Sequence, residues 1–324
     1  MIGRLGALAI AVALTACTHE TASEQTMAEA TSETETKPVE LGPWTTRSAE
    51  GGGSAVFAGD RTIAVGRGHA VIWQGDQRVA SVAAGAASPG RARVFGEHVV
   101  WGPNVLALDT HTIELRAAAV PEPMPMNLGA VAQAYAWSGE GAWLARSTSG
   151  SKSDGEVTLH RGSTGERVAS LHRSSGHVPE AIWLGSGWLV FGLDRPQVVD
   201  LEGKPIATIE LAGVTFSRFE ASRDERWLIA VDLNRAIGLI DTKDWTLVDR
   251  WVGPWADASI APSGHAVVGL ELGGTLRVAR ASAAGLEELE TITTIERANT
   301  VQLSDDAIAV VGGGELHQAA LRVR

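Results

Sequence analysis

The chain has 324 residues, of which 44% are hydrophobic and 20% charged, and its formal net charge is −11. A single Cys excludes a disulfide framework and a Cys-based zinc site, and the excess of acidic over basic residues argues against a nucleic-acid partner. Trp, with 11 residues, outnumbers Phe and Tyr together, which indicates that one bulky residue recurs at equivalent places of a repeat.

The first sixteen residues (MIGRLGALAIAVALTA) have the pattern of a secretory signal peptide. Arg4 precedes an apolar stretch over residues 5–14, and small residues lead to Cys17. About ten apolar residues are too few to cross a bilayer of roughly 30 Å as a helix. We therefore expect residues 1–16 to be a signal peptide that is cut before Cys17.

Leu14, Thr15, Ala16 and Cys17 resemble the lipobox of bacterial lipoproteins. The resemblance implies that the Cys17 thiol receives a diacylglycerol, that its freed amine is acylated, and that the acyl chains hold the protein on the lipid bilayer. Thr18 in place of Asp after the Cys implies, by resemblance to Gram-negative lipoproteins, the outer membrane. We expect a lipid-anchored protein of the cell envelope; the alternative is an ordinary signal peptide with an incidental Cys.

Residues 17–40 follow the cleavage site as an acidic, Thr-rich segment. Residues 18–40 hold six Glu against one Lys and no aromatic residue. Such a composition cannot bury enough apolar surface to offset the entropy of ordering. We expect a disordered tether of about 25 Å end to end, followed by a folded domain over residues 41–324.

The folded part repeats a tight turn followed by a short apolar strand. The strand segments lie at residues 62–65 (TIAV), 98–101 (HVVW), 142–145 (AWLA), 187–191 (GWLVF), 226–231 (RWLIAV), 265–270 (HAVVGL) and 307–311 (AIAVV). Their starts are 36 to 45 residues apart. A period near 40 with several short strands per repeat is typical of β-propeller blades.

Turns and strand patterns within each repeat support an all-β fold. Gly, Ser and Asp supply the turns, and the apolar runs predict inner strands, whereas alternating segments such as 78–84, 167–172 and 246–252 predict outer ones. GLEELETITTIE at 285–296 is the nearest approach to a helical pattern, and it suits an edge strand as well. The Gly runs at 51–54 and 312–314 are interpreted as turns or linkers.

We therefore predict a single seven-bladed β-propeller with four-stranded antiparallel blades. The last repeat has room for about three strands before Arg324, so the segment around residues 44–47 is expected to supply the missing outer strand. Pairing of the two ends would close the ring and remove exposed sheet edges.

In period and turn pattern the blades resemble the WD-repeat and quinoprotein-like propeller families. The Trp-Asp dipeptide of the first family is absent, since Gln74 follows Trp73, and Asp109 and Asp241 follow aliphatic residues. The DT turns at 109–110 and 241–242 and the STGE turn at 163–166 resemble quinoprotein-like repeats. The aligned Trp pattern of quinone-dependent dehydrogenases is missing. We expect no cofactor.

The Trp residues of the repeat are expected to pack blade against blade, as large apolar side chains do. Trp101, Trp143, Trp188 and Trp227 all lie in the apolar runs. Trp44 and Trp255 fall in or near connections between blades and are the candidates for exposed contact residues.

Metal and catalytic motifs are not evident, because the nine His are scattered and no nucleophile elbow, phosphate loop or HExxH is present. A ligand face is expected where the loops after the apolar strands meet the connections between blades. Its candidate residues are Arg67, Asn104, Asp194, Arg195, Arg218, Asp232, Asn234, Arg235, Trp255, Asp257 and Glu271.

The preferred hypothesis is a non-enzymatic envelope lipoprotein whose propeller binds a protein or envelope component. The alternative is a hydrolase or lactonase with a metal on the propeller axis, which requires Asp, Asn and Glu side chains gathered at one mouth. A quinoprotein-like oxidoreductase is the third hypothesis.

Overall fold

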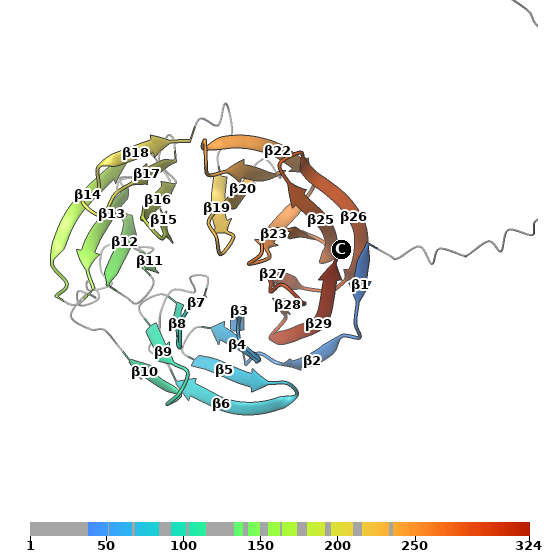
Figure 1. Ribbon diagram of the computed structural model, residues 1–324. Helices are drawn as coiled ribbons and strands as arrows, with labels where there is room; N and C mark the ends of the chain where they lie inside the picture. Colours follow the sequence, from blue (N-terminus) through green and yellow to red (C-terminus); the bar gives the residue numbers. More distant parts are fainter. Residues whose placement is uncertain are drawn as a thin grey trace, which may run out of the picture. The chain divides into compact units, whose positions relative to one another are not determined.

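The computed structural model describes residues 38–50, 52–66, 69–83, 92–101, 104–114, 133–138, 142–149, 155–162, 164–173, 180–191, 196–209, 216–232 and 236–324. All of them belong to one compact unit, residues 37–324. The elements described in this unit are β-strands, which form six four-stranded antiparallel sheets and one five-stranded sheet. The sheets follow one another around a ring, so the fold is an all-β propeller (Figure 1).

Each four-stranded sheet follows the chain from the axis of the ring outward (Figure 1). The first contains β3 (Gly52–Ala58), β4 (Arg61–Gly66), β5 (His69–Gln74) and β6 (Gln77–Ala83). The second contains β7 (Arg93–Phe95), β8 (His98–Trp101), β9 (Asn104–Ala107) and β10 (Thr112–Glu114). The third contains β11 (Gln133–Trp137), β12 (Trp143–Ser149), β13 (Gly155–Arg161) and β14 (Arg167–Arg173).

The remaining four-stranded sheets continue the ring. The fourth contains β15 (Glu180–Leu184), β16 (Gly187–Phe191), β17 (Gln197–Val199) and β18 (Pro205–Thr208). The fifth contains β19 (Phe216–Ala221), β20 (Trp227–Asp232), β21 (Ala236–Asp241) and β22 (Thr246–Val252). The sixth contains β23 (Trp255–Ile260), β24 (Ala266–Glu271), β25 (Thr275–Ser282) and β26 (Gly285–Thr294), whose outermost strand confirms the edge strand expected near residue 285.

The five-stranded sheet joins the two ends of the described chain. It contains β27 (Ala298–Leu303), β28 (Ala307–Gly312), β29 (Glu315–Val323), β1 (Val39–Leu41) and β2 (Thr45–Ser48). Both N-terminal strands pair antiparallel with β29, β2 with its first half and β1 with its second. The segment around residues 44–47 therefore supplies an outer strand, as expected, and β1 includes two residues that the sequence analysis placed in the tether.

The apolar runs of the repeat are the second strand of each sheet, not the innermost one. In β20 and β28 every residue after the first is buried, because both faces of these strands lie between neighbouring sheets. The strands nearest the axis are β3, β7, β11, β15, β19, β23 and β27 (Figure 1). They have mixed sequences such as FSRFEA and ANTVQL, which is why the hydrophobic pattern did not mark them.

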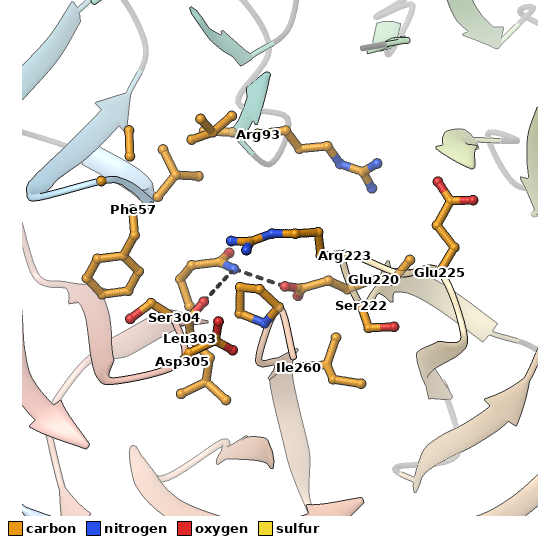
Figure 2. Close-up of a pocket in the computed structure, with 18 of the residues that line it drawn as sticks. Phe57, Arg93, Glu220, Ser222, Arg223, Glu225, Ile260, Leu303, Ser304 and Asp305 are labelled. Atoms are coloured by element: carbon orange, nitrogen blue, oxygen red, sulfur yellow. Dashed lines mark hydrogen bonds between the residues drawn. The ribbon is translucent and has the colours of Figure 1, made fainter. Parts of the chain in front are cut away.

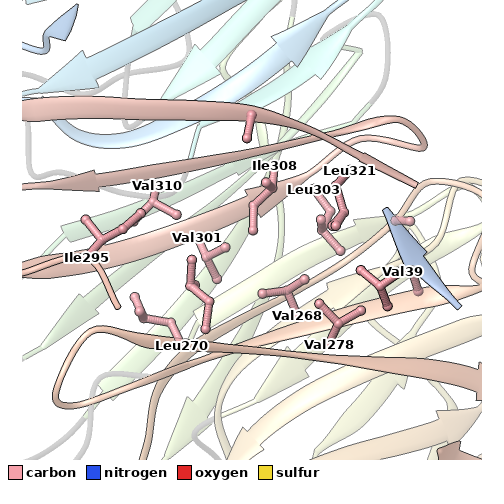
Figure 3. Close-up of a cluster of buried hydrophobic side chains, with 14 residues drawn as sticks. Val39, Val268, Leu270, Val278, Ile295, Val301, Leu303, Ile308, Val310 and Leu321 are labelled. Carbon is pink, nitrogen blue, oxygen red and sulfur yellow. The ribbon is translucent and has the colours of Figure 1, made fainter. Parts of the chain in front are cut away.

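The hydrophobic core is divided into clusters that lie between consecutive sheets. One of them joins Val268, Leu270 and Val278 of the sixth sheet to Val301 and Val310 of the five-stranded sheet (Figure 3). Trp188 is fully buried in another such cluster and meets Trp183 edge-to-face, with ring centroids 4.9 Å apart. The expectation that Trp residues pack blade against blade is confirmed for Trp101 and Trp188.

The glycine runs differ from one another. Residues 52–54 belong to strand β3, so their interpretation as a turn or linker was wrong. Gly313 and Gly314 have φ angles of 61° and 86° and form the turn between β28 and β29, as expected.

Candidate functional site

An axial cavity of about 910 Å³ opens at the end of the ring where the innermost strands turn into the second strands. Its wall comes from β3, β7, β15, β19, β23 and β27 and from the turns that follow most of them (Figure 2). Its apolar side chains include Val56, Phe57, Val94, Trp183, Ile260 and Leu303. Its charged side chains are Arg93, Glu220, Arg223, Glu225, Asp305 and Asp306.

Serine side chains fix the shape of the turns at this mouth. The Ser222 hydroxyl accepts a hydrogen bond from the Trp227 amide at 3.0 Å, and the Ser304 hydroxyl accepts one from the Ala307 amide at 2.9 Å. Both turns thus use a side-chain oxygen to satisfy a backbone donor that the tight reversal leaves without a ladder partner. This is the physical reason for a Ser at the start of the two turn sequences, SRDE at 222–225 and SDD at 304–306.

Hydrogen bonds from turn to turn hold the mouth open in a fixed shape. The Gly185 amide donates to the Glu225 carboxylate, and the Arg223 amide donates to the Pro262 carbonyl at 2.8 Å. The Ser263 amide donates to Asp305 at 2.7 Å. These bonds connect the fourth, fifth, sixth and five-stranded sheets in succession, so the rim of the cavity is formed by the fold itself rather than by free loops.

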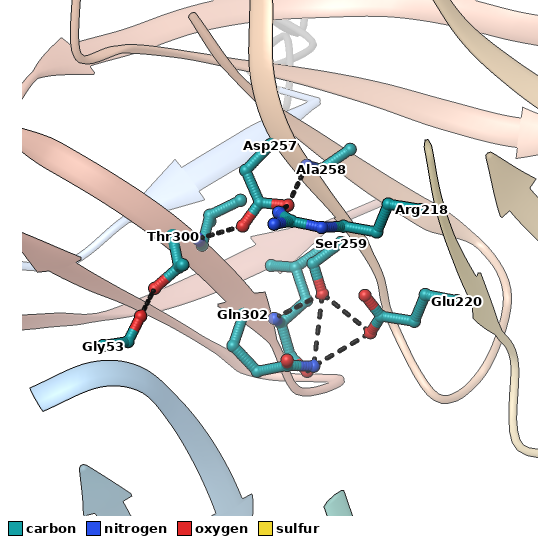
Figure 4. A network of polar contacts seen from close by, with 10 residues as sticks. Gly53, Arg218, Glu220, Asp257, Ala258, Ser259, Thr300 and Gln302 are labelled. Atoms are coloured by element: carbon teal, nitrogen blue, oxygen red, sulfur yellow. Dashed lines mark hydrogen bonds and ion pairs between the residues drawn. The ribbon is translucent and has the colours of Figure 1, made fainter. Parts of the chain in front are cut away.

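A polar network (Figure 4) contributes Glu220 and Gln302 to the wall of the cavity. The side-chain amide of Gln302 donates to Glu220 at 2.9 Å and to the Ser259 hydroxyl at 3.2 Å. The Ser259 hydroxyl in turn donates to Glu220 at 3.0 Å. The Leu303 amide donates to the same hydroxyl at 3.0 Å. Three sheets are joined by this network, and an amide on the axial edge of β27 is satisfied by a side chain of β23.

Asp257 forms a second layer of the network. Its carboxylate is fully buried, pairs with Arg218, and accepts hydrogen bonds from the Val301 amide at 3.0 Å and the Ala258 amide at 2.7 Å. The Thr300 hydroxyl continues the layer by donating to the Gly53 carbonyl at 3.1 Å. Asp257 therefore accepts the hydrogen bond of the Val301 backbone amide, just as Ser259 accepts that of the Leu303 backbone amide.

Two arginine side chains cross the cavity from opposite walls (Figure 2). Arg93 extends from β7, and Arg223 extends from the turn after β19. The Arg223 side chain is exposed, and within the described part of the chain no hydrogen bond or ion pair reaches its guanidinium. Its donors are available to a ligand.

The carboxylates around the cavity are already engaged within the protein. Glu225 and Asp305 accept the turn-to-turn bonds, Glu220 belongs to the network, and Asp306 accepts a hydrogen bond from the Ser304 hydroxyl at 2.9 Å. Beside the cavity, the hydrogen bond from the Ser222 hydroxyl is the main cause that lowers the pKa of Asp224 below its usual value of 3.8, so this carboxyl is ionised at neutral pH.

The predicted ligand-face residues that the structure describes, namely Asn104, Arg218, Asp232, Trp255, Asp257 and Glu271, do not line this cavity. They were placed at the other end of the strands, where loops follow the second strands, whereas the cavity lies where the first strands end. Asp232 is buried and pairs with Arg250 at 2.7 Å, and Glu271 pairs with Arg277 at 3.3 Å. Among the described candidates, Arg218 pairs with Asp257, and Trp255 lies opposite Glu271 on the adjacent strand.

Asn104 and Trp255 are buried rather than presented to solvent. Asn104 is 1% exposed, and its side-chain amide has no hydrogen-bond partner among the described residues. Trp255 is 4% exposed and lies over Gly269, where a side-chain carbon would come within 2.4 Å of its ring. The prediction that Trp255 is an exposed contact residue was wrong, because a glycine in the apolar strand β24 makes room for its ring.

Several predicted residues lie outside the described part of the chain. They are Cys17, Arg67, Asp194, Arg195, Asn234 and Arg235. Within the described ranges, no three His, Cys, Asp or Glu side chains gather as a metal site would require. No helix found there is long and apolar enough to cross a membrane.

Comparison with known proteins supports the fold and nothing finer. No family model matches the chain, and no curated protein matches its sequence. Among solved structures, a chain of the mitotic checkpoint complex aligns with a TM-score of 0.62 at 11% identity, covering 86% of this chain and 93% of that chain. The fold is a β-propeller. In all, 1451 chains of solved structures match, and a structural likeness of this kind shows the fold alone.

The residues that sequence reasoning missed are Arg93, Arg223 and Gln302 in particular. Arg93 and Gln302 lie in first strands that carry no apolar run, and Arg223 lies in a turn that was assigned a purely structural role. The positions of the turns could have identified these residues. In a propeller the ends of all first strands lie at the same mouth of the axial channel, so the turns that follow them lie there too.

Proposed function

We propose that the chain is an envelope lipoprotein, anchored through acylated Cys17 to the outer membrane of a Gram-negative bacterium, whose propeller is a non-enzymatic binding module for a protein or envelope component. The observation that carries the binding role is the preformed axial cavity, with its rim fixed by turn-to-turn hydrogen bonds. We also propose that the ring has seven blades, the last being the five-stranded sheet.

The cavity supports binding rather than chemistry because its polar side chains serve the fold. The carboxylates of Glu220, Glu225 and Asp305 are each held by donors of a neighbouring sheet. A general base or nucleophile needs a reactive group directed at substrate, with a partner that activates it. The described residues offer no specific observation in favour of the lactonase or the quinoprotein alternative.

The anchor is tested by expressing the full chain in a Gram-negative host with an alkyne-labelled palmitate analogue. Wild type should incorporate the label and sediment with the outer membrane, whereas Cys17→Ala should lose both. Thr15→Ser serves as the matched control, because it keeps a small residue before the cleavage site, and it should behave as wild type. Label and membrane retention in Cys17→Ala would contradict the anchor.

The non-enzymatic nature of the binding module is tested separately, by measuring turnover of a panel of lactones and esters by the purified full chain. We expect no turnover above the rate in buffer. Turnover that is abolished by a chelator or by Asp232→Ala would contradict a non-enzymatic module and restore the hydrolase alternative.

A further inference from the structure

We infer that the axial cavity binds a ligand with a single carboxylate on an apolar body, held by the guanidinium of Arg223 with Arg93 on the opposite wall. The inference names the ligand chemistry of the binding module proposed above and rests on that proposal for the existence of a ligand. Two sources share this chemistry, the carboxyl end of a polypeptide with an apolar last residue and a small aliphatic acid.

Arg223 has a fixed backbone and a side chain directed into the cavity. Its backbone is fixed, since its amide donates to the Pro262 carbonyl at 2.8 Å, while its side chain extends into the cavity (Figure 2). In the described part of the chain its guanidinium has no partner. Arg226, three residues further on, pairs with Asp241 at 2.7 Å and lies over Trp227. Of these two arginines in one turn, the one that enters the cavity is the one without a partner among the described residues.

The four carboxylates of the cavity wall restrict which ligand charges the cavity can accept. Because Glu220, Glu225, Asp305 and Asp306 already accept hydrogen bonds from the protein, they are poor receptors for a cation that would also meet two guanidinium groups. They still repel anions, and a phosphate dianion more than a carboxylate monoanion. A planar carboxylate also matches the paired donors of a guanidinium.

The apolar wall accounts for the rest of the ligand. Phe57 lies on the side of the cavity away from Glu225 (Figure 2), and Val94, Trp183 and Ile260 add to the apolar lining. A short aliphatic chain placed against these side chains would be removed from water while its carboxylate faces Arg223. Concave sites with an apolar wall and few polar groups bind small ligands in this way.

The test titrates the purified full chain, in detergent, with four probes: N-acetyl-alanyl-leucine, its C-terminal amide, hexanoate and hexanamide. We expect saturable one-to-one binding of at least one acid and binding at least tenfold weaker for its amide. Arg223→Gln should weaken binding of that acid at least tenfold, whereas Arg226→Gln, in the same turn but outside the cavity, should change it less than twofold. Equal thermal midpoints will show that both variants are folded.

The two sources are distinguished by which acid binds more tightly, the peptide acid for a polypeptide end and hexanoate for a small acid. Equal binding of acid and amide, an unchanged affinity in Arg223→Gln, or no saturable binding of either acid at about 10 mM would overturn the inference. None of these results bears on labelling of Cys17 or on a partner bound at another face, so failure of this inference is distinguishable from failure of the proposed function.

Discussion

The first and second strands of each sheet differ in burial and in how their backbone groups are paired. Strands such as β20 and β28 are paired on both sides and buried on both faces, so they consist almost entirely of aliphatic residues. The innermost strands β19, β23 and β27 have one edge without a neighbouring strand, and they carry Arg, Asp, Ser and Gln. These side chains satisfy the edge of the adjacent innermost strand, as Asp257 and Ser259 do for Val301 and Leu303.

The difference teaches where binding surfaces arise in this fold. Aliphatic second strands hold neighbouring sheets together but leave no polar group for a ligand. The innermost strands must bring polar groups to the axis to satisfy their own edges, and the same strands line the cavity. The polar side chains that stabilise the ring and the side chains that could bind a ligand therefore come from the same innermost strands and the turns that follow them.

Truncation of a buried second-strand residue should have the largest effect. Trp188 is fully buried between the third and fourth sheets, so Trp188→Ala should lower the free energy of unfolding by about 3–5 kcal/mol. Urea denaturation followed by tryptophan fluorescence measures the loss. Ile206→Ala, at an exposed position of the outer strand of the same sheet, is the control and should cost less than about 0.5 kcal/mol. A loss below about 1 kcal/mol for Trp188→Ala would contradict the packing described.

The second strands were also the part of the fold that the sequence predicted best. Apolar runs at 226–231 and 307–311 recur because burial on both faces requires them, and their period identified the propeller. The innermost strands could not be located in this way, since Gln302 and Glu220 acquire their roles from partners 82 residues apart. The exposure of Trp255 was predicted wrongly for a related reason: its burial depends on Gly269, which lies in the adjacent strand β24.

Loss of a polar group from an innermost strand should have a smaller but still large effect. Asp257→Ala removes a buried partner of Arg218 and the acceptor of the Val301 amide. Because Arg218 is 37% exposed and can be rehydrated, the cost should be near the lower end for broken buried pairs, about 3 kcal/mol. A double-mutant cycle with Arg218→Ala in urea measures the coupling. Additive effects would show that the pair contributes nothing to the ring.

An ion pair between the outer strands β25 and β26 should matter least and should depend on pH. The hydrogen bond from Arg277 is the main cause that lowers the pKa of Glu288 below its usual 4.5. A lowered pKa in the folded protein stabilises it above about pH 4.5, and this contribution is lost as pH falls through the folded value. Glu288→Gln should therefore reduce the fall in thermal midpoint below pH 4.5. An identical pH profile in both proteins would contradict this role.

The central claim is that side chains of one innermost strand satisfy the axial amides of the next. Amide hydrogen exchange on the full chain tests it directly, through the Val301 and Leu303 amides in wild type and in Ser259→Ala. We expect both amides to be protected in wild type and Leu303 to exchange at least tenfold faster in the variant, with Val301 changed much less. Rapid exchange of Leu303 in wild type, or an unchanged rate in Ser259→Ala, would contradict the account.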